Sequence, residues 1–239
     1  MNRYSCIVLF TFLLSACAAQ PPATGEAAET IAVAPVLTSE NGMVAAAHPL
    51  AARAGAEMLH NGGNAVDAAI AVSLALGVVE PYASGIGGEG YMVAVMADGR
   101  EVAIDFRSTA PALANYASLD AAGGLGEVRY TPKGHCIAGV PAGISEALKL
   151  ARLPLGVLAA PAIRLAEEGF EVNETFATVN MDRWEVLYQN APEFLNDGMP
   201  WAQGEIYRNP ELARTLRILA EEGARAYYEG ELAGSLDEF

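Results

Sequence analysis

The stretch SGIGGEGYMVAVMADGREVAIDF, residues 84–106, decides the fold of this chain. Two apolar runs, Tyr91–Met96 and Val102–Phe106, stand on either side of Asp98-Gly99. An Asp-Gly pair between two such runs favours a tight turn that joins antiparallel strands. The stretch therefore predicts a β-hairpin that follows a glycine-rich loop.

Two helices are predicted before this loop. The first begins at Pro49, because proline is favoured in the first helical turn. The second, Ala65–Val79, is apolar on every side except Asp67 and Ser73, as expected of a buried helix. Helices followed by an antiparallel hairpin indicate an α+β fold, with helices layered on an antiparallel sheet. Apolar periodicity and capping residues predict further helices at Ile144–Ala151, Val157–Glu168, Asn173–Gln189, from Pro210 after Asn209, and at Leu232–Leu236.

Composition excludes several classes of protein. Of the 239 residues, 52% are apolar and 18% are charged, which provides a sizeable core and excludes a disordered chain. The chain carries 14 basic and 29 acidic residues, a net charge of −15, so it lacks the basic face that a nucleic-acid-binding protein needs. The one long apolar run, Ile7–Ala16, is too short for a bilayer, which needs about 20 residues.

The first residues predict export. Arg3, an apolar segment and a small-residue region form the pattern of a bacterial signal peptide over residues 1–16. Leu14-Ser-Ala-Cys17 resembles a lipobox, which implies that Cys17 is lipidated and becomes the first mature residue. An ordinary signal peptide that contains a cysteine is the alternative. Ala18 after the cysteine favours the outer membrane, so we expect a periplasmic protein whose only membrane contact is its lipid anchor.

A tether is predicted between this anchor and the folded region. Residues 17–40 are rich in Ala, Pro, Thr and Glu, and the folded region is expected over residues 41–239. The alternative is a first strand at Thr30–Leu37. With Cys17 acylated, Cys136 is left alone in the mature chain, so no disulfide framework is expected and stability must come from the core.

The glycine-rich loop, Gly85–Gly90, allows two interpretations. Glycine-rich turns bind phosphates when they lie between a strand and a helix. Here the loop follows a helix and enters a strand, and it lacks the lysine of a P-loop. Close approach of backbone to backbone, or of backbone to substrate, is therefore the favoured interpretation.

Few residues offer catalytic chemistry. His48, His60 and His135 do not pair at ligand spacing, so neither a metal site nor a cofactor is predicted. His135 precedes Cys136, but neighbours in a chain rarely present their side chains to each other, so an incidental cysteine is favoured over an activated thiol. The residues of this chain alone therefore predict no catalytic nucleophile.

One residue is a candidate for substrate binding. Arg107 directly follows the second predicted strand and precedes a Ser-Thr-Ala-Pro turn. An arginine fixed at a strand end presents a planar fork that binds a carboxylate through two hydrogen bonds. An intramolecular pair with Asp105 or another acid is the alternative, and the residues alone do not separate the two.

Several segments together resemble the large-subunit region of the γ-glutamyltransferases, also called γ-glutamyltranspeptidases or glutathione hydrolases. The resemblance covers the chain from Gly42 to the end, and its motifs follow in family order. The motifs are GMVAAAHPL (42–50), NGGNAVDAAIAV (61–72), GVVEPYASGIGG (77–88), DFRSTAP (105–111), GVPAG (139–143), PAIRLAEEGF (161–170) and NPELARTL (209–216).

The resemblance implies a fold and a reaction. The fold is the αββα sandwich of the N-terminal-nucleophile hydrolases, here incomplete because only the large-subunit portion is present. In this family the precursor cleaves itself, and the new N-terminal threonine of the small subunit attacks the γ-glutamyl amide of glutathione. Water or an amino acid then accepts the glutamyl group, without cofactor or metal. The family's arginine after Asp-Phe corresponds to Arg107, which would hold the α-carboxylate of the γ-glutamyl group.

This sequence departs from the family pattern in three places. Ser108 stands where a glutamate is usual, and Glu89 interrupts the usual glycine run. These two changes leave open a glutaryl or cephalosporin acylase, or a poly-γ-glutamate enzyme. No Thr-Thr-His-x-Ser stretch occurs, so the nucleophile is expected beyond residue 239 and these residues alone are expected to be inactive. A truncated, non-catalytic lipoprotein is the remaining alternative.

Overall fold

The computed structural model describes residues 38–112, 114–128, 131 and 134–238. The chain divides into two units, Met1–Thr38 and Ser39–Phe239, and the elements below belong to the second. The predicted signal peptide, Cys17, residues 17–37 of the tether and the alternative strand Thr30–Leu37 lie outside the described residues.

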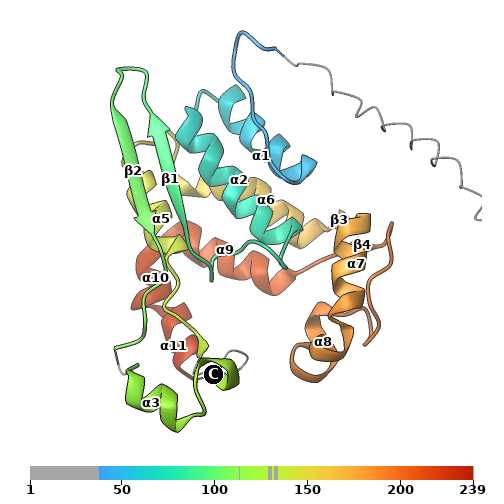
Figure 1. The fold of residues 1–239 in the computed structure, drawn as a ribbon. Helices are drawn as coiled ribbons and strands as arrows, with labels where there is room; N and C mark the ends of the chain where they lie inside the picture. Colours follow the sequence, from blue (N-terminus) through green and yellow to red (C-terminus); the bar gives the residue numbers. More distant parts are fainter. Residues whose placement is uncertain (1–37, 113, 129–130, 132–133, 239) are drawn as a thin grey trace, which may run out of the picture. The chain divides into compact units, whose positions relative to one another are not determined.

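The predicted hairpin is confirmed (Figure 1). Strand β1, Gly90–Val95, pairs antiparallel with β2, Glu101–Phe106, in a register that sets Gly90 opposite Phe106 and Val95 opposite Glu101. Gly99 has a φ of +83°, which suits glycine and closes the turn. The described residues contain one further strand pair, β3 (Phe170–Glu171) with β4 (Ile206–Tyr207).

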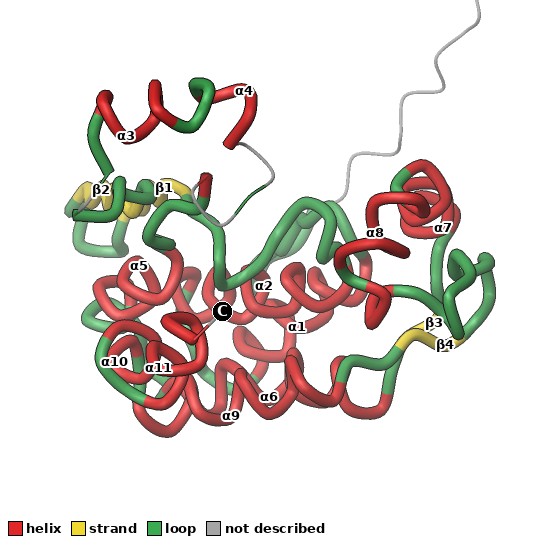
Figure 2. The backbone as a smooth tube through the Cα atoms, turned by 90° about the horizontal axis from the view of Figure 1, so that it is seen from below, coloured by secondary structure: helices red, strands yellow, loops and turns green. Residues whose placement is uncertain are grey.

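A layer of helices supports the hairpin (Figure 2). Helix α2 packs between α1 and α6, α6 packs on α9, and α5 lies against β2. The helices of the described residues are α1 (Pro49–His60), α2 (Ala65–Val79), α3 (Tyr116–Ala121), α4 (Leu125–Val128), α5 (Val140–Ala147), α6 (Leu155–Glu168), α7 (Glu174–Asp182), α8 (Trp184–Asn190), a 3-10 turn (Pro192–Phe194), α9 (Pro210–Glu222), α10 (Ala224–Tyr228) and α11 (Glu231–Glu238). None of these helices is both long and apolar enough to cross a bilayer.

Two predicted helices differ from the observed ones. The single helix expected over Asn173–Gln189 is wrong, because the chain leaves the helical conformation at Arg183, which separates α7 from α8. After this break the indole Nε1 of Trp184 donates a hydrogen bond to the carbonyl of Gly198 at 2.9 Å. The apolar periodicity of residues 173–189 cannot predict a contact with a residue outside that segment. The helix expected over Ile144–Ala151 instead ends at Ala147, and turns follow it.

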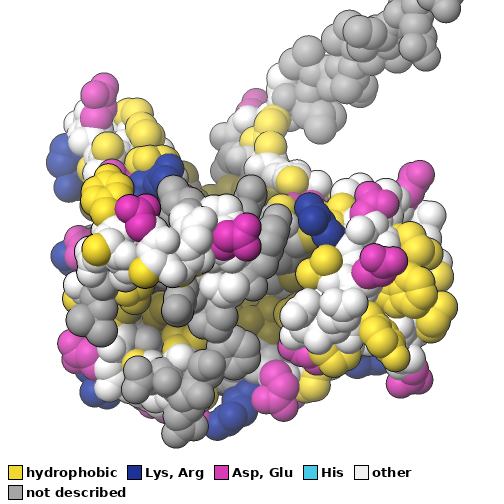
Figure 3. Space-filling model, turned by 60° about the horizontal axis from the view of Figure 1, so that its bottom comes forward, with side chains coloured by type: hydrophobic (Ala, Val, Ile, Leu, Met, Phe, Trp, Pro, Cys, Tyr) yellow, Lys and Arg dark blue, Asp and Glu magenta, His cyan; other side chains and the backbone are white. Residues whose placement is uncertain are grey.

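Apolar surface remains exposed on α2, β1, α7 and α8. Helix α2 is not buried all round, since Ala65, Ala69 and Ser73 are exposed along one stripe. On β1, Met92 and Ala94 pack against the core, whereas Tyr91, Val93 and Val95 are 64%, 78% and 72% exposed. Figure 3 shows hydrophobic side chains gathered over α7 and α8 as well. The outer face of the hairpin, formed by Tyr91, Val93 and Val95, is therefore left uncovered by the described residues.

The N-terminus of α1 contains a titratable cap. The Nδ1 atom of His48 accepts a hydrogen bond from the backbone N–H of Leu50 at 3.1 Å, and the side chain is buried edge-on against Phe170. A ring nitrogen that accepts must be unprotonated, so the imidazolium form loses this cap. Burial lowers the pKa of His48 below its ordinary value, and the nearby carboxylate of Glu80 partly opposes this shift.

The free energy of unfolding is therefore expected to fall as the pH drops below about 6.5, because the unfolded chain binds the His48 proton more readily than the folded one. His48→Asn keeps a capping acceptor and cannot titrate, so it should reduce this fall between pH 7.5 and 5.5. The lost cap is worth about 1 kcal/mol. Urea unfolding at both pH values measures the effect, and His60→Asn, at an exposed position on the same helix, is the control. An equal fall in wild type and His48→Asn would contradict it.

Candidate functional site

The glycine-rich loop packs backbone against backbone, as predicted. The carbonyl of Gly88 accepts hydrogen bonds from the backbone N–H groups of Gly139 and Val140, at 2.9 and 3.2 Å, at the start of α5. A Cβ added to Gly77 would lie 3.1 Å from the Cα of Gly85. The loop thus joins α2, α5 and the start of β1.

Gly139 fixes the backbone beside Arg107. A Cβ on Gly139 would lie 1.9 Å from the carbonyl oxygen of Phe106 and 3.1 Å from that of Arg107. Two further hydrogen bonds, between Thr109 and Ile137, continue this contact at 3.1 and 2.8 Å. The end of β2 is consequently held against the segment that leads into α5.

Gly139→Ala is expected to destabilise the folded chain by about 2–3 kcal/mol, because backbone atoms must move to admit the methyl group. Urea unfolding of the full chain measures the change. Gly156→Ala is the matched control, since a Cβ there meets nothing within 4 Å and alanine favours the helix. A loss below 0.5 kcal/mol for Gly139→Ala would show that the two segments separate easily.

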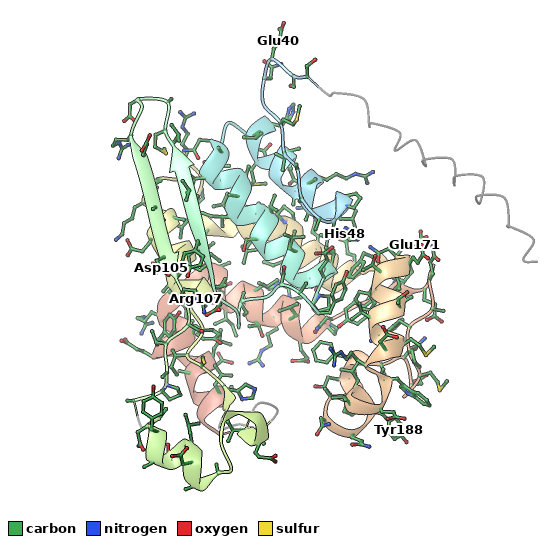
Figure 4. All side chains as sticks on the ribbon, in the orientation of Figure 1. Glu40, His48, Asp105, Arg107, Glu171 and Tyr188 are labelled. Atoms are coloured by element: carbon green, nitrogen blue, oxygen red, sulfur yellow. The ribbon has the colours of Figure 1, made fainter. Side chains whose placement is uncertain are left out.

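Arg107 lies at the end of β2, beyond the last strand pair (Figure 4). Its backbone N–H donates to Oδ1 of Asp105 at 3.0 Å, and its side chain is 56% exposed. The guanidinium lies 5.9 Å from the ring centroid of Tyr91, and its Nη2 is 3.2 Å from Oε1 of Glu89. The intramolecular ion pair that the sequence left open as an alternative does form, and its acid is Glu89 and not Asp105.

Glu89 binds both residues that follow β2. Its Oε2 accepts a hydrogen bond from the backbone N–H of Ser108 at 2.8 Å and another from the Ser108 hydroxyl. These bonds, with the Arg107 charge as a smaller contribution, hold the pKa of Glu89 below its usual range. A hydrogen bond with Tyr91 and the charge of Glu89 raise the pKa of Arg107, so both members of the pair are charged at neutral pH.

Two cavities meet at this pair. Glu89 and Tyr91 line one of about 730 Å³ in front of the glycine-rich loop, and Arg107 and Tyr228 line another of about 280 Å³ between β2 and α5. Phe106 lines both. The Tyr228 hydroxyl donates to the carbonyl of Ala138 at 2.7 Å and so supports the segment before α5.

Sequence reasoning missed Glu89, Tyr91 and Tyr228 as neighbours of Arg107. The hairpin register could have identified Glu89. Gly90 is paired with Phe106, so the residue before Gly90, Glu89, lies opposite the residue after Phe106, Arg107. Tyr228 lies far away in sequence and gave no such signal.

The other chemical candidates do not form a site. Cys136 and His135 are exposed, and among the described residues no three His, Cys, Asp or Glu side chains gather as metal ligands would. Glu167, an acid near the end of α6, forms an exposed ion pair with Arg217 on α9. The substrate-binding role predicted for Arg107 stays a prediction.

Comparisons with known proteins agree with this fold. The sequence profile of the Gamma-glutamyltranspeptidase family matches residues 51–239. A glutathione hydrolase proenzyme of Pseudomonas sp. (strain A14) is 40% identical over 209 residues, which cover 83% of this chain and 36% of that protein. The chain thus spans about a third of the length of this curated relative.

Two solved structures extend the likeness. The γ-glutamyltranspeptidase of Helicobacter pylori superposes with a TM-score of 0.80 at 31% identity, covering 85% of this chain and 61% of that one. The cephalosporin acylase of Bacillus halodurans superposes with a TM-score of 0.77 at 34% identity, covering 86% and 41%. The predicted α+β fold, the large-subunit portion of an N-terminal-nucleophile hydrolase, is confirmed. By its sequence and its fold, the chain belongs to the γ-glutamyltranspeptidase family.

Proposed function

We propose that the complete protein is a γ-glutamyltransferase or glutathione hydrolase. The observation that carries this proposal is the family match over residues 51–239, with an arginine fork at the end of β2 where a γ-glutamyl α-carboxylate needs a partner. The substrate would be glutathione or a related γ-glutamyl compound.

The nucleophile of this reaction would be the N-terminal threonine of a small subunit released by self-cleavage. Its own α-amine would serve as the base that takes the hydroxyl proton and passes it to the amine that leaves when the amide C–N bond breaks, so an acyl-enzyme forms without histidine or metal. Water or an amino acid then releases the glutamyl group. The uncovered outer face of the hairpin supports such a subunit, because Tyr91, Val93 and Val95 offer a sheet surface for a second sheet to cover.

The test is an assay of the complete precursor on matched amides. The γ-glutamyl amide should be hydrolysed well and the glutaryl amide, which lacks the α-amine, poorly. A preference for the glutaryl amide would favour the second candidate, an acylase. That candidate is supported by Ser108, by Glu89 and by the likeness to a cephalosporin acylase.

Residues 17–239 alone are expected to hydrolyse no γ-glutamyl amide, because no threonine among them has the context of the family's nucleophile. The purified fragment, assayed beside the complete precursor, tests this. Turnover that depends on a threonine of the fragment would overturn it.

We also propose that Cys17 is lipidated and that the protein is exported to the periplasm, where this lipid anchors it to the outer membrane. The support is the lipobox-like run Leu14–Cys17 at the end of a signal-peptide pattern. Labelled palmitate should enter the wild type and not Cys17→Ser. Equal labelling of both would overturn lipidation at this residue.

A further inference from the structure

We propose that Glu89 is the positioning residue of Arg107 and that Ser108 fixes Glu89 in this role. The inference rests on the proposed function, in which Arg107 binds the α-carboxylate of the substrate. It adds a residue that determines how well that carboxylate binds.

The hairpin register brings the three residues together. Gly90 is paired with Phe106, so Glu89 and Arg107 face each other one step beyond the last strand pair. Their backbones are fixed there, because the carbonyl of Gly88 binds the start of α5 and Gly139 packs on Phe106. The contact between Glu89 and Arg107 therefore follows from the fold as well as from side-chain rotamers.

The two oxygens of Glu89 have different partners. Oε2 accepts both hydrogen bonds from Ser108, one from its backbone N–H and one from its hydroxyl. This leaves Oε1 directed at Nη2 of Arg107, 3.2 Å away. A carboxylate held by two donors at one oxygen has little freedom, so it restrains the guanidinium that its other oxygen contacts.

Arg107 keeps donors for a substrate. A guanidinium has five N–H groups; Nη2 contacts Glu89, and one further hydrogen bond is made with Tyr91. More than half of the side chain is exposed, and it lies against the ring of Tyr91. An incoming carboxylate can bind the remaining donors while Glu89 and Tyr91 keep the guanidinium plane in place. Without Glu89, the Arg107 side chain would be ordered only when the substrate binds, and the entropy lost in that step would lower the affinity for the substrate.

Two of the three departures from the family pattern meet in this single contact. The acid that usually follows the arginine is replaced by Ser108, and the acid Glu89 stands in the glycine run just before the facing strand β1. An acid is therefore present next to Arg107, but it comes from the other side of the hairpin. Moving it back, in the double variant Glu89→Gly with Ser108→Glu, should restore the function of the pair.

The experiment measures KM and kcat of the mature two-subunit enzyme on two substrates. One is a γ-glutamyl amide, and the other is the matching 4-aminobutyryl amide, which lacks the α-carboxylate. Glu89→Gln should raise KM for the γ-glutamyl amide roughly tenfold, change kcat less than about twofold, and leave KM for the other amide unchanged. The double variant should recover KM to within about threefold of wild type.

Two further variants complete the design. Ser108→Ala should raise KM for the γ-glutamyl amide by about two- to fivefold, and it carries the test if Glu89→Gln does not fold. Asp98→Asn is the matched control, because it breaks a similar exposed ion pair, with Arg100, at the other end of the same hairpin. Asp98→Asn should change neither KM nor kcat.

The outcomes separate this inference from the proposed function. If Arg107→Ala loses activity on the γ-glutamyl amide while Glu89→Gln and Ser108→Ala keep the wild-type KM, the positioning role is overturned and the proposed function stands. A wild-type enzyme that does not hydrolyse the γ-glutamyl amide overturns both. An equal rise in KM for both amides would also overturn the positioning role, since it would show a general structural effect.

Discussion

Asp67→Ala is expected to lower the free energy of unfolding by about 3–5 kcal/mol. The Asp67 side chain is fully buried, and it accepts hydrogen bonds from the backbone N–H groups of Asn64, Arg152 and Leu153 at 2.7, 3.0 and 2.8 Å. Alanine leaves these three part-buried N–H groups without their carboxylate partner. It also removes half of the capping box that starts α2, in which Asn64 is the other member.

This carboxylate connects parts of the chain that are distant in sequence. The side chain of Asn64 also donates to the carbonyl of Leu150 at 2.8 Å, so both members of the capping box bind the segment between α5 and α6. The start of α2 and the start of α6 are thereby fixed to each other. The loss should therefore reduce the stability of the whole helical layer and not only of one helix end.

Urea unfolding of the full chain, followed by circular dichroism, measures the change for Asp67→Ala. Asp67→Asn keeps the shape but places an amide N–H₂ near these backbone donors, so we expect an intermediate loss of about 1–3 kcal/mol. Asp182→Ala, at an exposed position near the end of α7, should stay within about 0.5 kcal/mol of wild type. A loss below 1 kcal/mol for Asp67→Ala would show that water or backbone movement satisfies the three donors.

Local signals in the sequence were sufficient for the elements near the site. The Asp98-Gly99 pair identified the hairpin, and the apolar run Ala65–Val79 identified α2. Longer-range facts were not predictable in this way. The break at Arg183 accompanies a hydrogen bond from Trp184 to a distant carbonyl, and the exposed stripe of α2 depends on what covers the helix. The apolar periodicity of a segment predicts its secondary structure, but it does not tell which other elements pack against that segment.

The candidate site shows the same division. The sequence predicted correctly that Arg107 lies at the end of β2, because the apolar run that forms this strand ends at Phe106. Its partner, Glu89, could be predicted only from the hairpin register. That register follows from the sequence only after the residues of the turn have been assigned. Tyr228 approaches from α10, more than a hundred residues later, and only the packing of α10 on α5 brings it there.

In the proposed γ-glutamyl enzyme, Arg107→Ala is expected to reduce kcat/KM of the complete protein on a γ-glutamyl amide by roughly 30- to 1000-fold. Two charges would be left without their partner, the α-carboxylate of the substrate and Glu89, which lies 3.2 Å from the guanidinium. The loss should appear mainly in KM if the carboxylate is bound equally in the ground state and the transition state. Steady-state kinetics of the mature enzyme measure both constants.

Arg107→Lys distinguishes the effect of the positive charge from the effect of the planar guanidinium fork. A lysine keeps one positive charge but lacks the planar fork, so it should recover only part of the loss, to roughly tenfold below wild type. Arg100→Ala is the control, because Arg100 is a similarly exposed arginine paired with Asp98 on the same hairpin, and its loss should not change kcat/KM. The 4-aminobutyryl amide should be hydrolysed equally by wild type and Arg107→Ala, since it has no α-carboxylate. A change within experimental error on the γ-glutamyl amide would remove Arg107 from the substrate site.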